Sequence, residues 1–142
     1  MRAFPMIMEA TTNKTRLVIK SLFSTIADQG FGQLFLDQLA ENVIWTATGS
    51  SPMRGRYESK QAYREQVLDK LHDKLEYSPR PTIDRIIADD QWAAVYFHTE
   101  GARALNGLDF SMEYCWLMRV ENDKVVEVVG FYDSKKMCDL FL

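Results

Sequence analysis

The clearest pattern in the chain is an alternation of large apolar side chains with mixed side chains over residues 110–120. Because successive side chains of a β-strand point to opposite faces, this alternation predicts a strand with one bulky apolar face. A helix layer or a ligand must cover such a face. The apolar positions are Phe110, Met112, Tyr114, Trp116, Met118 and Val120, and the mixed positions are Ser111, Glu113, Cys115, Leu117 and Arg119.

Two turn signals bracket this strand. The Asn-Gly pair at 106–107 and the Asn-Asp pair at 122–123 consist of residues that tolerate the positive φ of a two-residue hairpin. A further alternating run, Trp92–Glu100, precedes the first pair. We therefore predict a three-stranded antiparallel sheet over Trp92–Asp133.

Helical periodicity in the first half of the chain predicts the cover for this sheet. Apolar residues at three- and four-residue spacing indicate a helix over Asn13–Gln29, a shorter one over Gly32–Leu39, and a third from a Ser59 cap to Leu75. Strands are expected over Val43–Thr48 and Thr82–Ala88. Helices come first and mostly antiparallel strands follow, which is typical of an α+β fold.

Composition and charge exclude several classes of protein. The 142 residues contain no linker rich in glycine, serine or proline, so we expect one domain over residues 13–142 and an N-terminal arm, loose or added to a partner as a strand, over residues 1–12. Lysine and arginine number 17, aspartate and glutamate 20, and the formal net charge is -3. Nucleic acid is not an expected partner, since no basic stripe interleaves with aromatic residues.

The two cysteines and the start of the chain indicate where in the cell the protein is expected. Cys115 and Cys138 stand far apart and outside any metal-binding spacing, so we expect no metal site. An organic cofactor is not expected either. A reducing cytoplasm suits two unpaired thiols. The apolar start is interrupted by Pro5 and is too short for a signal-peptide core or a membrane span, and a membrane is therefore not an expected partner.

Several motifs, taken in order, resemble one family. The helix closing at Asp28–Gly30, the strand entering the loop Gly49–Gly55, and the block from residues 106–107 through Tyr114 to Asp133 are similar to SnoaL-like, ketosteroid-isomerase-related proteins of the nuclear transport factor 2 superfamily. The resemblance implies a cystatin-like cone, in which a strongly curved, mostly antiparallel sheet wraps around N-terminal helices. It also implies a deep, mostly apolar pocket open at one end, and a dimer through the outer sheet face.

The acid and base residues of the steroid isomerases are absent. Those relatives use a tyrosine on the first helix, an aspartate base on the strand before the Gly-Pro loop, and a protonated aspartate after the Asn-Gly turn. The corresponding positions here are Phe23, Thr46 and Trp116, none of which can take over the proton transfer. The aspartate-histidine pair of dehydratase-type relatives is also incomplete, since Asp28 is present but residues 76–78 include no histidine.

Strand register decides which polar residues reach the pocket. If residues 106–107 form the whole loop, Phe97 lies opposite Trp116, Thr99 lies opposite Tyr114, and His98 turns to the outer face. A one-residue bulge would reverse the assignment and bring His98 and Glu100 into the pocket as an acid-base pair.

The second hairpin carries the same ambiguity. A three-residue loop over 121–123 places the even-numbered residues of 128–132 on the pocket face, and a two-residue loop places the odd-numbered residues of 129–133 there. We favour the first loop. It leaves Asp133 at the pocket rim or as the cap of a final helix over Ser134–Leu140.

These registers define a candidate pocket. Tyr114 and Tyr132 are expected to present their hydroxyls to one polar atom of a small apolar ligand, with Asp133 or His98 as catalytic base. The same aromatic residues also suit plain core packing, and His72, amid charged neighbours, is interpreted as an exposed surface residue. The expected ligand-pocket residues are Phe23, Thr46, Phe97, Thr99, Met112, Tyr114, Trp116, Met118, Val128 and Tyr132.

Three functions fit this description. The first is a cofactor-independent enzyme, such as an isomerase, hydrolase, dehydratase or cyclase, that acts on a small hydrophobic carbonyl compound or epoxide. The second is a non-catalytic binder of an apolar molecule, and the third is a protein-interaction domain that uses the outer sheet face. In each case we expect a homodimer through that face, because Cys115, Leu117, Val129 and Phe131 have no helix to cover them.

Overall fold

The computed structural model describes the backbone of residues 3–142 and the side chains from residue 6 onward. The helices are α1 (Ala3–Gln29), α2 (Gln33–Asp37), α3 (Lys60–Tyr63), α4 (Asp69–Lys74) and α5 (Ser134–Asp139), with a π-helical turn, Arg64–Leu68, between α3 and α4. The strands are β1 (Leu39–Ala47), β2 (Gly55–Tyr57), β3 (Leu75–Tyr77), β4 (Arg80–Asp89), β5 (Trp92–Glu100), β6 (Arg103–Ala104), β7 (Glu113–Glu121) and β8 (Lys124–Phe131).

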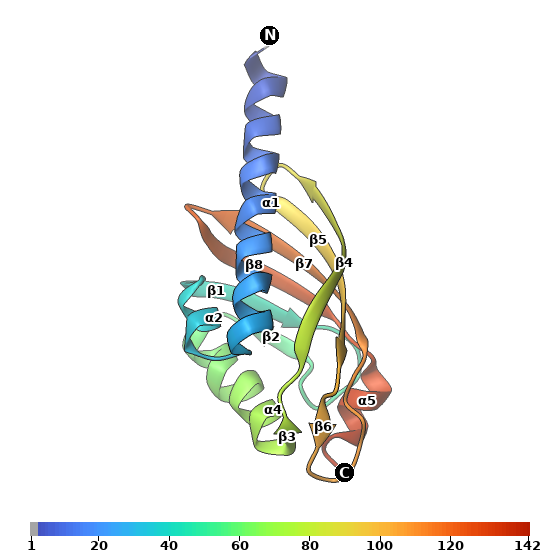
Figure 1. The fold of residues 1–142 in the computed structure, drawn as a ribbon. Coiled ribbons are helices and arrows are strands. Elements are labelled where there is room, and N and C mark those ends of the chain that lie inside the picture. The colour runs from blue at the N-terminus through green and yellow to red at the C-terminus, as the bar shows by residue number, and fades with distance from the viewer. Residues whose placement is uncertain (1–2) are drawn as a thin grey trace.

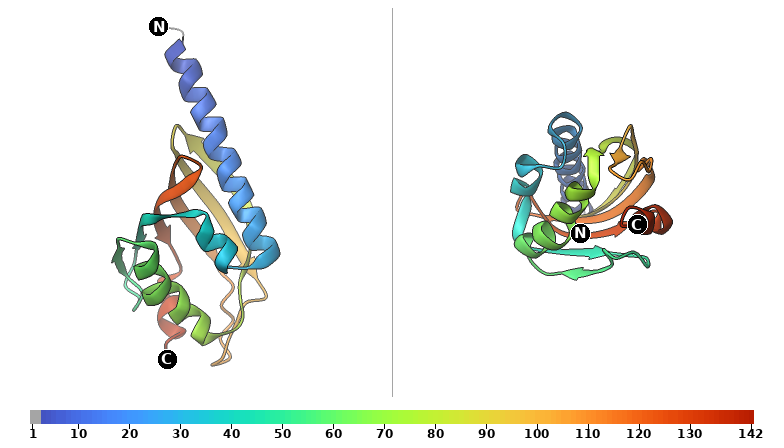
Figure 2. Two further views of the ribbon diagram at one scale, coloured as in Figure 1. Left: turned by 90° about the vertical axis from the view of Figure 1, so that its left-hand side faces the viewer. Right: turned by 90° about the horizontal axis from the view of Figure 1, so that it is seen from below.

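Six of the strands form one curved sheet in the order β2-β1-β8-β7-β5-β4 (Figure 1). The β1–β8 pair is parallel and the other neighbours are antiparallel. The sheet bends around the helices (Figure 2), and α1 lies along its concave side against β4. The predicted α+β architecture with a curved, mostly antiparallel sheet is confirmed. Within residues 3–142, the helices are all too short or too polar to cross a membrane.

Helix α1 begins earlier than the pattern predicted. It is continuous from Ala3, so the expected arm over residues 1–12 is helical over its described part, and residues 1–2 lie outside the description. Pro5 does not prevent this, because the backbone N–H that proline lacks has no partner in the first turn of a helix. Thr12 and Thr15 tie the helix to the β4–β5 turn through the N–H and C=O of Asp90, at 2.8 and 2.7 Å. The part before Thr12 projects beyond the sheet (Figure 1).

The expected register of β5 against β7 is wrong by two residues. Phe97 lies opposite Tyr114, and Val95 lies opposite Trp116. The Asn-Gly pair at 106–107 is not the hairpin loop between these strands. It lies in the longer connection between β5 and β7, where the Gly107 N–H donates to the Ala104 carbonyl at 3.0 Å. In the same connection, β6 pairs with β3. A shift of two residues keeps every side chain on its expected face.

In the second hairpin, the loop differs from the predicted one, but the β8 side chains lie on the predicted faces of the sheet. The turn has two residues, 122–123, both with positive φ (51° and 62°), in place of the three-residue loop. A β-bulge then leaves Val126 without a partner, and Trp116 lies opposite Gly130. The shorter loop alone would have turned each β8 side chain to the opposite face of the sheet, and the extra residue of the bulge turns it back. Gly130 and Val128 are therefore buried on the concave side, as predicted.

The concave face carries an aromatic core. Tyr114 and Trp116 are 7% and 3% exposed, which confirms that this face of β7 points toward the helices. The Trp116 ring lies 5.8 Å from Phe23 on α1, 4.9 Å from Trp45 on β1 and 5.0 Å from Phe97 on β5, measured between ring centroids. Side chains from the first helix and from three strands thus meet at Trp116.

Candidate ligand cavity

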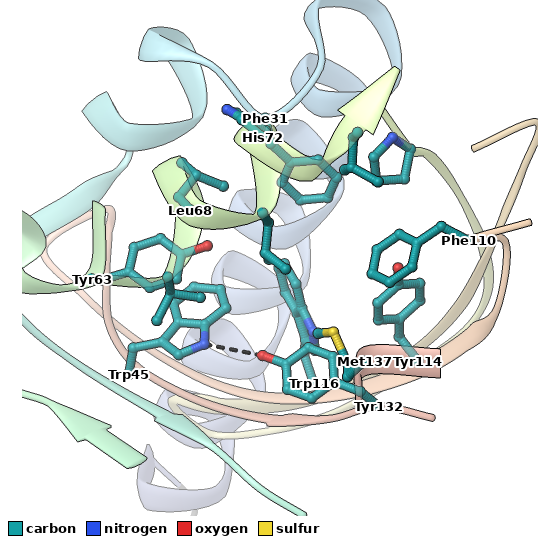
Figure 3. A pocket seen from close by; sticks show the side chains of 14 residues that line it. Phe31, Trp45, Tyr63, Leu68, His72, Phe110, Tyr114, Trp116, Tyr132 and Met137 are labelled. Atoms are coloured by element: carbon teal, nitrogen blue, oxygen red, sulfur yellow. Dashed lines mark hydrogen bonds between the residues drawn. The ribbon is translucent and has the colours of Figure 1, made fainter. Parts of the chain in front are cut away.

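A small cavity lies between the helical segment Lys60–Lys74 and the concave face of the sheet (Figure 3). Its volume is about 50 Å³, because its own aromatic side chains fill most of the cone. This leaves room for a compact ligand, well below the several hundred Å³ typical of drug-sized sites. The cavity is lined by Phe31, Trp45, Tyr63, Val67, Leu68, Leu71, His72, Leu75, Pro79, Phe110, Tyr114, Trp116, Tyr132 and Met137.

The helical wall of the cavity depends on a π turn. Ser59 caps the start of α3 by accepting a hydrogen bond from the Ala62 N–H at 3.0 Å, as its position in the sequence predicted. The π turn over Arg64–Leu68 then adds a residue to the helical repeat, so that the consecutive residues Val67 and Leu68 are both buried against the cavity. A regular helical stripe counted from Tyr63 in steps of four residues assigns Val67 to the wall but misses Leu68.

His72 lies at the mouth of the cavity, and its interpretation as a surface residue is corrected here. It is half-buried and lines both the cavity and an adjoining entrance groove formed by Gln29–Gly32, Leu75, Glu76, Ser78 and Arg80. Arg80 shapes this groove by donating to the Ala27 and Asp28 carbonyls at the end of α1, at 3.1 and 2.6 Å. Leu68, Leu71, His72 and Leu75 stand at positions i, i+3, i+4 and i+7, so helical spacing counted from Leu68 is the sequence signal that would have placed His72 on the wall.

The side-chain oxygen atoms of the residues that line the cavity belong to three tyrosines, Tyr63, Tyr114 and Tyr132. The Tyr132 hydroxyl accepts a hydrogen bond from Trp45 Nε1 at 3.1 Å, and the Tyr63 ring stacks on Trp45 with centroids 4.0 Å apart. Burial raises the pKa of Tyr63 and Tyr132 well above the usual value, and it raises the pKa of Tyr114 to about 12. These hydroxyls therefore stay protonated near neutral pH and can donate hydrogen bonds.

The structure distributes nine of the ten expected pocket residues over three places, and the tenth, Thr46, lies in a fourth. Tyr114, Trp116 and Tyr132 line the cavity. Phe23, Phe97, Met118 and Val128 are buried but lie behind its wall. Thr99 and Met112 border a wide, open groove at the end of the sheet, which we call the outer groove and which also includes Tyr96, His98, Ser111, Glu113–Cys115 and Phe131–Asp133, together with Lys136.

Thr46 points away from the cavity. Along β1, Val43, Trp45 and Ala47 are buried, and the residues between them turn to the outer face. Because neighbours on a strand alternate, Thr46 and Trp45 cannot both face inward. Trp45 therefore takes the place in the wall that was expected for Thr46, a difference of one residue in the count from Gly49.

His98 and Asp133 do not line the cavity. His98 Nδ1 lies 2.7 Å from Asp84 Oδ2, and its Nε2 lies 3.3 Å from Glu100 Oε1, so the pKa of His98 is raised chiefly by Asp84. Asp133 caps α5 by accepting from the Lys136 N–H at 3.2 Å. The bulge that would have turned His98 inward is absent from the described β5–β7 pairing.

The outer groove does bring His98 and Asp133 near the edges of Tyr114 and Tyr132. It is open to solvent, and its charged groups already have partners within the protein, since Glu113 accepts from the Tyr96 hydroxyl and Lys136 donates to the Ser111 carbonyl. The enclosed cavity is therefore the better candidate for a ligand site. Over residues 3–142, no group of three His, Cys, Asp or Glu side chains is placed to hold a metal ion.

Comparisons with known proteins agree with this architecture. The family model of the SnoaL-like domain matches residues 20–128. A search of curated proteins finds no match. A nuclear transport factor 2-like protein of unknown function from Burkholderia pseudomallei has 16% identity and a TM-score of 0.74, over 89% of this chain and 96% of that chain.

Two further solved structures share the fold. A protein of unknown function with a cystatin-like fold from Xanthomonas campestris has 23% identity and a TM-score of 0.71, over 89% of this chain and 96% of that chain. TerC, co-crystallised with polyporic acid, has 14% identity and a TM-score of 0.71, over 89% of this chain and 97% of that chain. At these identities, the likeness shows the fold alone.

Proposed function

This chain belongs to the SnoaL-like domain family, and we propose that it binds a small, uncharged, mainly apolar organic molecule in the cavity beneath its helices. The chemistry of the wall carries this proposal. Most of the lining side chains are aromatic or aliphatic, and neither a carboxylate nor a lysine or arginine is among them. An ionic ligand would lose its hydration there without gaining a partner of opposite charge, whereas an uncharged ligand would gain apolar contact and hydrogen bonds.

The structural neighbour TerC supports a small-molecule role, since it was co-crystallised with polyporic acid. In the present chain, the side chains that line the cavity decide which ligands fit. Trp45 stacked on Tyr63 gives one flat side to the cavity, and Tyr114 on β7 lies across from it (Figure 3). Flat or ring-shaped molecules fit between such walls better than branched ones.

Blocking the cavity tests this proposal. Leu71→Trp places a large side chain at the cavity wall and should abolish the binding of small ring compounds such as toluene, measured by changes in ¹H–¹⁵N spectra during titration. Leu17→Trp is the matched control, because Leu17 is 66% exposed on α1 and does not line the cavity. Equal binding by both variants and the unchanged protein would contradict a ligand site at this place.

A second function, proton transfer on the bound molecule, is favoured by the position of His72. Besides tyrosine hydroxyls, the cavity wall contains one acid-base side chain, and that is His72. An imidazole can act as general acid or base in a cofactor-independent isomerase, hydrolase, dehydratase or cyclase. The outward positions of His98 and Asp133 favour His72 over either of them for this role.

Exchange of the α-hydrogens of a small ketone, cyclopentanone, with D₂O gives a direct assay. We expect His72→Gln to lower the catalysed exchange rate at least tenfold, which is typical of the loss of a general base. His98→Gln should leave the rate unchanged. If exchange with the unchanged protein does not exceed the buffer rate, the protein does not catalyse proton transfer on this ketone.

The outer sheet face is proposed as a homodimer interface. Ile87, Ala94, Leu117 and Val129 form one continuous row across β4, β5, β7 and β8. Ile87 is 63% and Leu117 is 37% exposed, and the neighbouring Phe131 is 45% exposed. Covering such a row with a second copy removes apolar area from water on both subunits.

Light scattering at micromolar concentration tests the dimer. Leu117→Asp should produce a monomer, whereas Leu105→Asp, at a site that is 66% exposed but outside the row, should not. A monomeric unchanged protein would contradict the proposal. We also place the protein in the cytoplasm, where the free thiols of Cys115 and Cys138 stay reduced, and cell fractionation tests that placement.

A further inference from the structure

Tyr114 and Tyr132 separate the cavity from the outer groove. Both residues line both spaces, so the wall between the two spaces is one side chain thick at this place. Within the described chain no strand pair closes it, because the pairing of β7 with β8 ends at Cys115 and Phe131. The outer groove has a volume of about 860 Å³, against about 50 Å³ for the cavity.

Of the two tyrosines, Tyr132 is the one that lies outside the sheet. Tyr114 belongs to β7, where it lies opposite Phe97 and stacks on its ring with centroids 4.7 Å apart. Tyr132 follows the last residue of β8. Its hydroxyl accepts from Trp45 Nε1 at 3.1 Å, which is the one side-chain hydrogen bond that the described chain gives it (Figure 3). A single neutral hydrogen bond thus supplies the polar part of what holds the Tyr132 ring in the wall.

The size of the cavity gives this arrangement a consequence for binding. An engineered apolar cavity of about 150 Å³ holds one benzene molecule, and the cavity of this protein measures about 50 Å³. A ring can therefore enter fully only if a side chain of the wall gives way. Trp45 and Tyr114 belong to paired strands, whereas Tyr132 lies beyond the strand end and has the outer groove behind it.

We infer that Tyr132 determines the size of the ligand that the cavity admits, by swinging into the outer groove when a ring enters. The inference rests on the proposed binding function and assigns the residue that selects ligands by size. The closed position is favoured without a ligand, because the swing leaves the Trp45 donor unpaired. The affinity for a ring is then reduced in proportion to the fraction of molecules in which Tyr132 is displaced.

Xenon and toluene distinguish the closed form from the open one. A single xenon atom fits the closed cavity, and toluene requires the space that Tyr132 vacates. In ¹H–¹⁵N spectra, with xenon applied under pressure, we expect both probes to shift the signal of Leu71 in the cavity wall. Toluene alone should also shift the signals of Ser111 and Cys115, because the displaced ring enters the outer groove that these residues line.

Two matched variants test the role of Tyr132. Tyr132→Phe removes the acceptor of Trp45 Nε1 and so weakens the closed form. We expect it to bind toluene about three- to tenfold tighter, as the loss of one neutral hydrogen bond predicts, and to bind xenon with nearly unchanged affinity. Tyr63→Phe removes a hydroxyl from the same cavity wall, but Tyr63 does not border the outer groove, so both affinities should stay nearly unchanged. Xenon binding by both variants shows that their fold and cavity persist.

Three results would overturn the inference. The first is an equal toluene affinity of Tyr132→Phe and Tyr63→Phe. The second is a toluene-induced shift at Gln29 and Ser78 of the entrance groove without one at Cys115, because the ring would then extend through the mouth of the cavity. In both cases the proposed binding function stands. If neither probe binds the unchanged protein, the binding function fails, and the role of Tyr132 fails with it.

Discussion

Position 130 of β8 is expected to require glycine because of Tyr132, the first residue after the strand. A Cβ atom built on Gly130 would lie 2.2 Å from the Tyr132 hydroxyl oxygen and 2.6 Å from the adjoining ring carbon. Gly130→Ala must therefore displace the Tyr132 ring. That ring accepts the hydrogen bond of Trp45 Nε1 at 3.1 Å, so its displacement leaves this indole without a partner.

Two opposing contributions decide whether Gly130→Ala raises or lowers the free energy of unfolding. Alanine restricts the unfolded chain more than glycine does, which would stabilise the fold by about 0.4 to 1 kcal/mol if the site had room. Leaving the buried Trp45 donor unpaired costs about 1 to 3 kcal/mol. We therefore expect Gly130→Ala to lower the free energy of unfolding by about 1 to 2 kcal/mol, measured by urea denaturation.

A double-mutant cycle isolates the cause. In a Tyr132→Ala background, alanine at position 130 meets no ring, and the substitution should become neutral or stabilising by up to about 1 kcal/mol. The Trp45 indole signal should move in Gly130→Ala as it does in Tyr132→Phe, which removes the accepting oxygen directly. A Gly130→Ala cost that is the same in both backgrounds would refute the proposed contact.

Three further predictions concern the remaining polar groups. Asp133→Ala should lower the free energy of unfolding by about 1 kcal/mol, and Asp133→Asn by much less, because an amide oxygen can also cap the helix; urea denaturation of both variants checks this. Since Asp84 raises the pKa of His98, the stabilising effect of this pair is complete below the usual histidine pKa of about 6.5 and is lost as the pH rises through the raised value. The stability difference between the unchanged protein and Asp84→Asn, measured across this range, should therefore shrink with increasing pH. Because burial raises the pKa of Tyr114 to about 12, the folded protein should lose stability above the unfolded tyrosine pKa of about 10, and Tyr114→Phe should weaken that loss in unfolding measured against alkaline pH.

Local sequence determined much of the sheet and the helices. The alternation along β7 was sufficient to place Tyr114 and Trp116 on the concave side, because side-chain direction on a strand depends on neighbouring residues alone. The cap at Ser59 is equally local, since an N-cap oxygen bonds to an amide within the same turn. Even the register errors kept each face, because they shifted pairings by an even number of residues.

The cavity was determined by tertiary structure. The predicted stripe included Tyr63 and Val67, but the packing of this helical segment over the sheet also turns Leu68 and His72 toward the cavity. The exchange of Thr46 for Trp45 in the wall depends on which face of β1 meets the helices, and a count back from Gly49 does not determine that face.

Hydrogen-bond partners of the cavity indoles were also decided in three dimensions. Trp45 and Tyr132 are 87 residues apart in sequence, and the fold brings them within 3.1 Å, while Trp116 receives no acceptor from the described chain. The sequence alone shows only that these residues are aromatic. Which of the two indole donors finds an acceptor depends on distances between separate strands, because a hydrogen bond requires the two atoms to approach within about 3 Å.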